Sequence, residues 1–163
     1  MPFPAPERDL AYIRDFAAAN RWTYTPDQER LALLQMFHWR AERQKLAEYV
    51  QVWGDAGRFY VNMKPPYDRQ SVLALVSPEL RPLLRIHDVG HTLAEVEALR
   101  DQLTGLIESL PGVEWGISHN YRTDRFDVTI VGEGNAAAIR RLLPRDLSHM
   151  TDITLGESPL VSF

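Results

Sequence analysis

The sequence contains no cysteine, and this excludes disulfide bridges, thiol nucleophiles and thiolate metal sites. Lysine is nearly absent too: only Lys45 and Lys64 are lysines among the 18 basic residues, and 22 acidic residues leave a formal charge of −4. Acidic residues interrupt the arginine clusters, as in Arg122-Thr-Asp124-Arg125. We therefore expect no nucleic-acid partner, since such proteins concentrate positive charge on one face.

Long apolar runs are missing as well, and no segment is long enough to span a bilayer. The first nine residues lack the basic region and the apolar stretch of a signal peptide. We therefore expect no membrane partner and a cytoplasmic protein. If the sequence is a processed form, the expectation changes to a secreted protein.

With 163 residues, 45% of them hydrophobic, the chain can form one domain or two small ones. Helical and strand periodicities alternate along it. They predict an α+β fold of two duplicated αββαβ units, each a small three-stranded sheet covered by helices on one face. An extra N-terminal helix is expected over residues 6–20. We divide the chain into an N-terminal helical extension (1–24), a first unit (25–91) and a second unit with a C-terminal tail (92–163).

The other elements follow from apolar spacing, capping residues and prolines. Apolar residues at helical spacing form one stripe on each of the first two helices: Leu10, Ile13 and Phe16 or Ala17 on the first, and Leu31, Leu34, Phe37 and Ala41 on the second. Further helices and strands are expected over residues 25–46, 50–63 (a hairpin), 68–76, 83–89, 92–110, 113–119, 125–131, 135–143 and 151–156.

A gap-free shift of 67 residues relates the two halves. It places Thr25 on Thr92, and the run Arg58-Phe-x-Val on Arg125-Phe-x-Val. The shared capping threonine and the shared strand motif favour an internal duplication. The alternative is convergence of two segments with similar apolar periodicity.

Strand alternation predicts that one face of each sheet is not covered by helices. In the first unit this face carries Gln51, Trp53, Tyr60 and Asn62. Its aromatic residues predict a surface that binds a protein partner. The alternative is that these rings cover the junction between the two units, and a further one is self-association through this face to form a homodimer.

The run Ile86-His87-Asp88-Val89-Gly90-His91 contains the His-Asp pair of metal-dependent phosphohydrolases of the HD superfamily. That chemistry needs a second histidine and a distal aspartate from neighbouring helices to hold the metal. Here the preceding residues are predicted as a strand, and the upstream His38 lies across a hairpin. Because these further ligands are not evident in the sequence, a metal-dependent hydrolase that uses His87, Asp88 and His91 is kept only as the alternative function.

Other catalytic motifs are weak. Gly132-Glu-Gly134-Asn-Ala-Ala137 formally matches a dinucleotide fingerprint, but too few residues follow it for a nucleotide-binding sheet. We interpret these glycines as a tight strand-to-helix turn. The sequence also lacks the G-x-S-x-G turn of serine hydrolases. We expect no cofactor and no enzymatic activity.

Four runs in the second half form a familiar order: a helix that begins Thr-Leu, a Gly-Val, an aromatic strand with a hairpin, and a closing strand that ends at Ser-Pro. They span residues 91–103, 111–116, 122–131 and 152–159. Over about residues 45–159 the chain thereby resembles the pro-region of alpha-lytic and streptogrisin-like secreted serine proteases. Asp124 departs from the asparagine that is usual in this family.

This resemblance implies a two-subdomain domain that binds a serine protease, assists its folding and inhibits it through a C-terminal tail. The last sheet would receive a strand of the partner by edge pairing. No protease lies within these 163 residues. We therefore predict a non-enzymatic protein-binding domain, a stand-alone relative of such pro-regions that acts as chaperone or inhibitor. Its expected partner-binding residues are Trp53, Tyr60, Leu160, Val161, Ser162 and Phe163.

Overall fold

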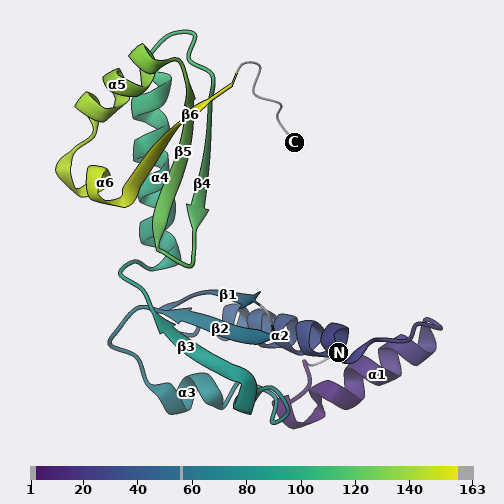
Figure 1. Ribbon diagram of the computed structural model, residues 1–163. Helices are drawn as coiled ribbons and strands as arrows, with labels where there is room; N and C mark the ends of the chain where they lie inside the picture. Colours follow the sequence, from purple (N-terminus) through teal and green to yellow (C-terminus); the bar gives the residue numbers. More distant parts are fainter. Residues whose placement is uncertain (1–2, 56, 158–163) are drawn as a thin grey trace. The chain divides into compact units, whose positions relative to one another are not determined.

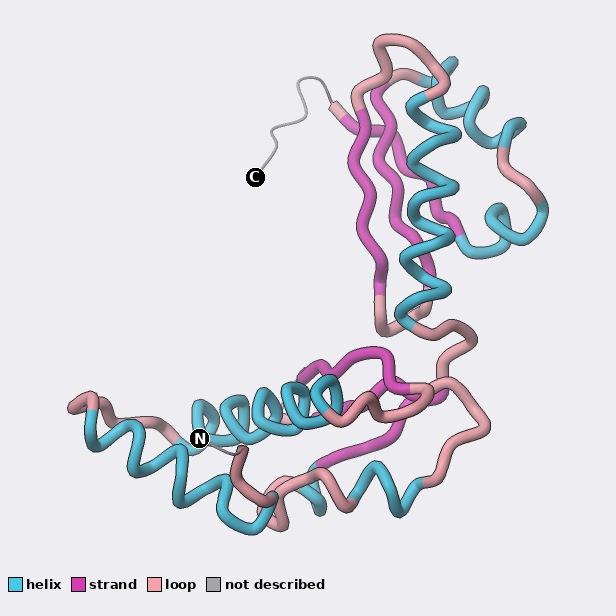
Figure 2. Tube along the Cα trace, turned by 180° about the vertical axis from the view of Figure 1, so that it is seen from behind, coloured by secondary structure: helices cyan, strands magenta, loops and turns pink. Residues whose placement is uncertain are grey.

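The computed structural model describes residues 3–55 and 57–157 (Figures 1 and 2). Its internal contacts divide the chain into two compact units, Met1–Thr92 and Leu93–Phe163. We describe each unit by itself. The partner-binding tail predicted at residues 160–163 lies outside the described residues.

The first unit contains two long helices, a short one and three strands. Their order along the chain is η1 (a 3-10 helix, Pro6–Arg8), α1 (Asp9–Ala19), α2 (Pro26–Arg43), β1 (Tyr49–Asp55), β2 (Arg58–Met63), α3 (Arg69–Leu73), η2 (a 3-10 helix, Arg81–Leu83) and β3 (Leu84–Asp88).

The second unit repeats the order from α2 to β3, with the helix α6 where the first unit has η2, and has no counterpart of η1 and α1 among its described residues. Its elements are α4 (Leu93–Glu108), β4 (Trp115–Asn120), β5 (Arg125–Val131), α5 (Glu133–Leu142), α6 (Arg145–Met150) and β6 (Thr151–Gly156).

Both sheets have the same topology, which confirms the predicted α+β fold. The orders are β1-β2-β3 and β4-β5-β6, with an antiparallel hairpin followed by a parallel strand. A parallel strand needs a crossover, and the helical segments between β2 and β3 and between β5 and β6 supply it. Helices lie against one face of each sheet (Figures 1 and 2).

The 67-residue shift also relates the parallel strand pairs. Phe59 pairs with Leu84, and at the shifted positions Phe126 pairs with Thr151. The first strands of the two hairpins do not follow it. Asp55 pairs with Arg58 across a two-residue turn, whereas Asn120 pairs with Arg125 across a four-residue turn. The helix before the hairpin compensates, because α2 has 18 residues and α4 has 16. Duplication itself stays a prediction.

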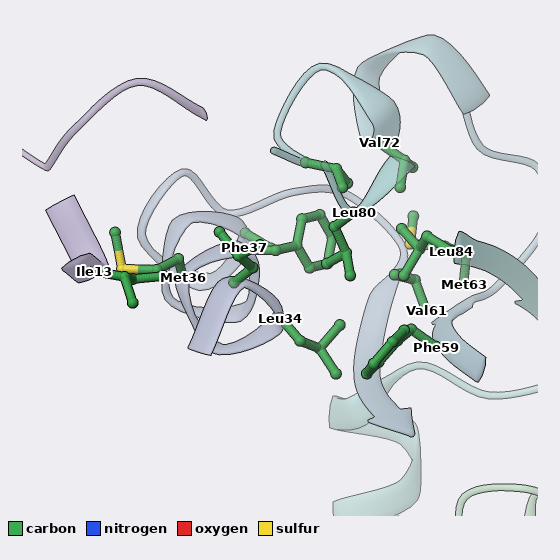
Figure 3. Close-up of a cluster of buried hydrophobic side chains, with 13 residues drawn as sticks. Ile13, Leu34, Met36, Phe37, Phe59, Val61, Met63, Val72, Leu80 and Leu84 are labelled. Carbon is green, nitrogen blue, oxygen red and sulfur yellow. The ribbon is translucent and has the colours of Figure 1, made fainter. Parts of the chain in front are cut away.

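The core of the first unit lies between its helices and the inner face of the first sheet (Figure 3). Phe37 of α2, Val61 of β2, Val72 of α3 and Leu80 are completely buried. The second unit has a separate apolar core, centred on Leu103 of α4 and on four side chains of β5, α5 and α6: Phe126, Ile130, Ile139 and Leu147.

Two residues expected on buried helix stripes are exposed instead. Phe16 is 46% exposed and Leu31 is 55% exposed. On α1, Ile13 and Ala17 face the core, and Phe16 is rotated away by one residue, about 100°. Leu31 lies about 120° around α2 from the buried Phe37. The prediction was right for Ala17 and wrong for Phe16 and Leu31, because the helices bury a narrower stripe than expected.

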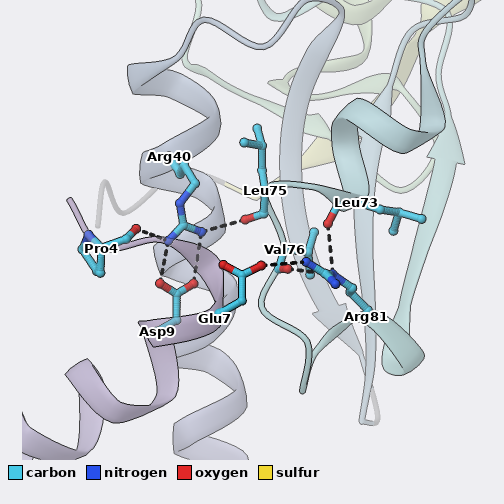
Figure 4. Close-up of polar contacts among 8 residues, drawn as sticks. All are labelled: Pro4, Glu7, Asp9, Arg40, Leu73, Leu75, Val76 and Arg81. Carbon is cyan, nitrogen blue, oxygen red and sulfur yellow. Dashed lines mark hydrogen bonds and ion pairs between the residues drawn. The ribbon is translucent and has the colours of Figure 1, made fainter.

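A buried ion pair attaches α1 to α2 (Figure 4). Arg40 Nη2 and Nη1 lie 2.5 and 3.0 Å from the two carboxylate oxygens of Asp9. The same guanidinium donates to the carbonyl oxygens of Pro4 and Leu75. Burial raises the pKa of the Asp9 carboxyl, and the hydrogen bonds from Arg40 offset part of this effect. One arginine therefore joins the N-terminal segment, α2 and the crossover.

The predicted helix cap at Thr25 and the predicted turn at Gly132 have the expected geometry. Thr25 caps α2 in a capping box, because Gln28 N donates to its hydroxyl while its own amide donates to the Gln28 side chain at 2.9 Å. Gly132 has a φ of 95° at the start of α5, which confirms a tight strand-to-helix turn there. Helix α6 was not predicted, since Pro144 was interpreted only as the end of α5, whereas it also precedes α6.

Candidate functional site

The outer face of the first sheet, turned away from the core, carries a stacked pair of aromatic rings. Trp53 on β1 lies directly opposite Tyr60 on β2. Their ring centroids are 4.0 Å apart and their planes are inclined by 14°. Strand alternation sends the neighbouring Phe59 and Val61 into the core, so the pair is fixed on the outer face. The sequence predicted this placement of the two rings.

Asn62 connects the pair to β3. Its Oδ1 accepts a hydrogen bond from Trp53 Nε1 at 2.9 Å and lies 3.0 Å from His87 Nδ1. Indole N–H groups only donate, so the amide atom beside Trp53 is the oxygen. Nδ1 of His87 must then donate as well, and this fixes the neutral tautomer with Nε2 unprotonated. Asn62 is 1% exposed, and it joins the three strands of the sheet on this face.

A polar pocket of about 300 Å³ lies beside Tyr60. Arg58 at the start of β2 and Arg85 on β3 bring two guanidinium groups to it, and both residues are exposed. The other lining residues are Gly57, Pro82 and Leu83. We define these residues with Tyr60 as the arginine pocket. Sequence reasoning missed it, although the 67-residue shift already placed Arg58 on Arg125.

The predicted metal-ligand run lies at the end of β3, and its members face different partners. His87 contacts Asn62 on the outer face, whereas Asp88 accepts a hydrogen bond of 2.5 Å from the Tyr67 hydroxyl. That hydrogen bond raises the pKa of Tyr67. Adjacent strand residues point to opposite faces, so His87 and Asp88 do not converge. Over residues 3–55 and 57–157, no three histidine or carboxylate side chains are grouped so as to hold a metal ion.

A second surface, which sequence reasoning missed, lies on the helical hairpin. Between α1 and α2 an apolar groove of about 230 Å³ is lined by aromatic side chains, among them Tyr12, Phe16, Tyr24 and Trp39. Trp22, in the connection between the helices, is exposed and contacts Phe16 edge to face. Large apolar residues at the positions of a helix that face away from its core are the signal that could have identified this groove.

Comparison with protein-family models finds no match to this chain, and comparison with curated protein sequences also finds none. Among the described residues, none of the helices has the length and apolar character needed to cross a membrane.

Proposed function

We propose that the chain is a non-enzymatic protein-binding protein, and that its partner contacts the outer face of the first sheet at Trp53 and Tyr60. The stacked pair carries this proposal. Two large rings on a rigid hairpin lose little conformational entropy on binding, and aromatic side chains of this kind supply much of the energy of protein interfaces. Neither ring belongs to the buried core of its unit.

The surroundings of the pair support a preformed binding surface. Asn62 holds the indole of Trp53 by a hydrogen bond, so the ring is oriented before a partner arrives. The arginine pocket adds charged hydrogen-bond donors at the edge of Tyr60. An aromatic centre bordered by arginines is a composition favoured at protein interfaces.

A hydrolase mechanism has less support from the same residues. The Nε2 atom of His87 would be able to ligate a metal, but Asp88 is engaged by Tyr67 away from this histidine. Metal-activated water needs several ligands around one ion. The geometry of the run therefore favours the binding function over the metal-dependent alternative.

The resemblance to protease pro-regions supports a secreted serine protease of the alpha-lytic or streptogrisin type as the partner. The two units, each of helices and a three-stranded sheet, are compatible with the two-subdomain domain that this resemblance implies. Whether binding inhibits the mature protease or assists its refolding is decided by two assays on the same pair of proteins. Slower hydrolysis of a peptide substrate identifies an inhibitor, and faster recovery of activity after dilution from denaturant identifies a chaperone.

The binding experiment uses such a protease with its active-site serine changed to alanine, so that the chain is bound and not cleaved. Calorimetry should give saturable binding that Trp53→Ala and Tyr60→Ala each weaken by roughly tenfold or more. The matched control is Trp22→Ala, which removes an indole of the same unit that lies outside the outer face of the sheet, and it should leave affinity unchanged. A chain ending at residue 159 measures the part played by the tail.

Two results would contradict the proposal. One is that the intact chain binds no protease of this type at the highest concentrations attainable. The other is a hydrolytic activity that depends on divalent metal and is lost in His87→Ala, which would establish the alternative function.

A further inference from the structure

The arginine pocket of the first unit differs in charge from the equivalent place in the second unit. In both units an arginine begins the central strand, Arg58 on β2 and Arg125 on β5. The parallel register then places Arg85 of β3 at the position that Asp152 holds on β6, since Tyr60 pairs with Arg85 and Asp127 pairs with Asp152. A carboxylate in one unit is thus replaced by a guanidinium in the other.

In the second unit the arginine has an internal partner. Arg125 Nε and Nη2 donate to the two carboxylate oxygens of Asp152 at 2.7 and 2.8 Å. Its Nη1 also donates to the carbonyl oxygen of His149 at 2.5 Å. This is the two-point geometry by which guanidinium groups recognise a carboxylate.

In the first unit no such carboxylate partner of Arg58 or Arg85 occurs among the side chains that the structure describes, and that of Asp55 is not one of them. Arg85 donates through Nη1 to the carbonyl oxygens of Pro82 and Leu84, each at 3.2 Å. The Arg58 guanidinium makes no hydrogen bond or ion pair with the side chains that the structure describes, which do not include that of Asp55. Two positive groups therefore line one pocket whose walls include the Tyr60 ring. Like charges that share a pocket are stabilised by an anion between them.

We propose that the arginine pocket binds the carboxylate group of a ligand, which takes the place that Asp152 takes beside Arg125. Arg58 supplies the two-point contact, and Arg85 supplies a second positive charge. The Tyr60 ring offers an apolar wall for the part of the ligand next to its carboxylate. The ligand is a small carboxylic acid or the free carboxylate of a polypeptide, and both present the same group. This inference does not depend on the proposed function.

The test is a nuclear magnetic resonance titration of the intact chain with benzoate, observed at the arginine Nε–Hε groups. Saturable shifts are expected at Arg58 and Arg85, whereas the equally sized but uncharged benzamide should cause none. Arg125 is the internal control, because Asp152 already occupies its guanidinium and its signal should not move.

Arg85→Asp is the decisive variant, because it rebuilds in the first unit the pair that the second unit contains. It should fold and should weaken benzoate binding by roughly tenfold or more. The control Arg100→Asp makes the same charge change at an exposed position of α4 and should bind as the unaltered chain does. If Arg85→Asp fails to fold, Arg58→Gln at the exposed hairpin end serves in its place.

The source of the carboxylate is assigned by a capped peptide with a free C-terminus and the same peptide amidated. Tighter binding of the free peptide than of benzoate assigns a polypeptide ligand, and the reverse order assigns a small acid. Each of these results supports a carboxylate site. Absence of saturable shifts, unchanged binding by Arg85→Asp and Arg58→Gln, or inorganic phosphate that binds more tightly than benzoate would overturn the proposal.

Discussion

The Oδ1 atom of Asn62 lies 3.0 Å from Nδ1 of His87, on the neighbouring parallel strand. Trp53 donates to this same oxygen, so one buried amide orients an indole and an imidazole at once. The side-chain orientations on the outer face therefore depend on Asn62, which is buried and offers little surface to a partner. Asn62 is a positioning residue for the proposed binding surface.

The Asn62 contacts predict the tautomer of His87. At alkaline pH, long-range proton–nitrogen spectra should show the proton on Nδ1, since the amide oxygen accepts from it. Asn62→Ala removes that acceptor, and the proton should then move to Nε2, the form favoured by an isolated imidazole. The same result in the variant and in the unaltered chain would show that Asn62 does not set the tautomer.

The buried Asp9–Arg40 pair predicts a large loss of stability on truncation of one partner. Asp9→Ala leaves the Arg40 guanidinium buried without its carboxylate and should lower the free energy of unfolding by about 3 kcal/mol. Replacing both residues, as Asp9→Leu with Arg40→Met, should recover most of this loss. Urea unfolding measures all three chains.

The exposed pair between Arg14 and Glu29 is the control for this comparison. Arg14→Ala should leave the free energy of unfolding nearly unchanged, because solvent screens an exposed pair. Equal effects of Arg14→Ala and Asp9→Ala would argue against a special part for the buried pair.

Thr25 should contribute to the stability of α2 through its capping box. Thr25→Ala removes the hydroxyl that accepts from Gln28 N and should cost about 1 kcal/mol of unfolding free energy. Thr25→Ser keeps the acceptor and should cost much less. Thr23→Ala, at an exposed position before the helix, is the matched control, and a loss as large as that of Thr25→Ala would point to a cause other than capping.

The ion pair between Arg125 and Asp152 should make the stability of the second unit depend on pH. The hydrogen bonds from Arg125 lower the pKa of Asp152 in the folded chain. The folded chain therefore binds fewer protons at this group than the unfolded chain does, and the stabilisation is fully present above the unfolded pKa of about 3.9. It is lost as the pH falls through the folded pKa.

The measurement is urea unfolding between weakly acidic and strongly acidic pH, followed at the amide signal of Val128 in β5. Asp152→Asn should lose the part of the acid dependence that belongs to this pair, and Arg125→Gln should lose the same part. Parallel stability curves for the unaltered chain and Asp152→Asn would show that the pair contributes nothing to it.

Element order and strand faces were predictable because they depend on local pattern. Alternating residues in the first hairpin place Trp53 and Tyr60 on one face whatever the rest of the chain does. The crossover topology also follows from the order of strands and helices. These features explain why the fold class agrees with the structure.

Other features depend on contacts between distant residues. Arg40 is buried because Asp9, 31 residues earlier, and two backbone carbonyl groups meet it. Helical spacing places Arg40 on the same face of α2 as the buried Met36 and Phe37, but the residue type predicts exposure, since arginine is almost never buried without a partner. The pairing of Asn62 with His87 is of the same kind, because it requires the register of a parallel pair.

The arginine pocket depends both on local sequence pattern and on contacts between distant residues. Its residues become notable only when Arg85 is compared with Asp152, and that comparison needs the strand register of both units. The sequence shift of 67 residues contains the correspondence, but the ion pair between Arg125 and Asp152 is what gives the substitution a chemical meaning.

The central claim is that a protein partner covers the outer face of the first sheet, and side-chain oxidation by hydroxyl radicals tests it most directly. The intact chain is oxidised alone and with the inactive protease, and modified residues are located by mass spectrometry. Protection of Trp53 and Tyr60 by the protease, with Trp22 and Tyr12 as reactive as in the free chain, is the predicted result. Unchanged reactivity of Trp53 and Tyr60 in a complex that is demonstrably formed would contradict the account.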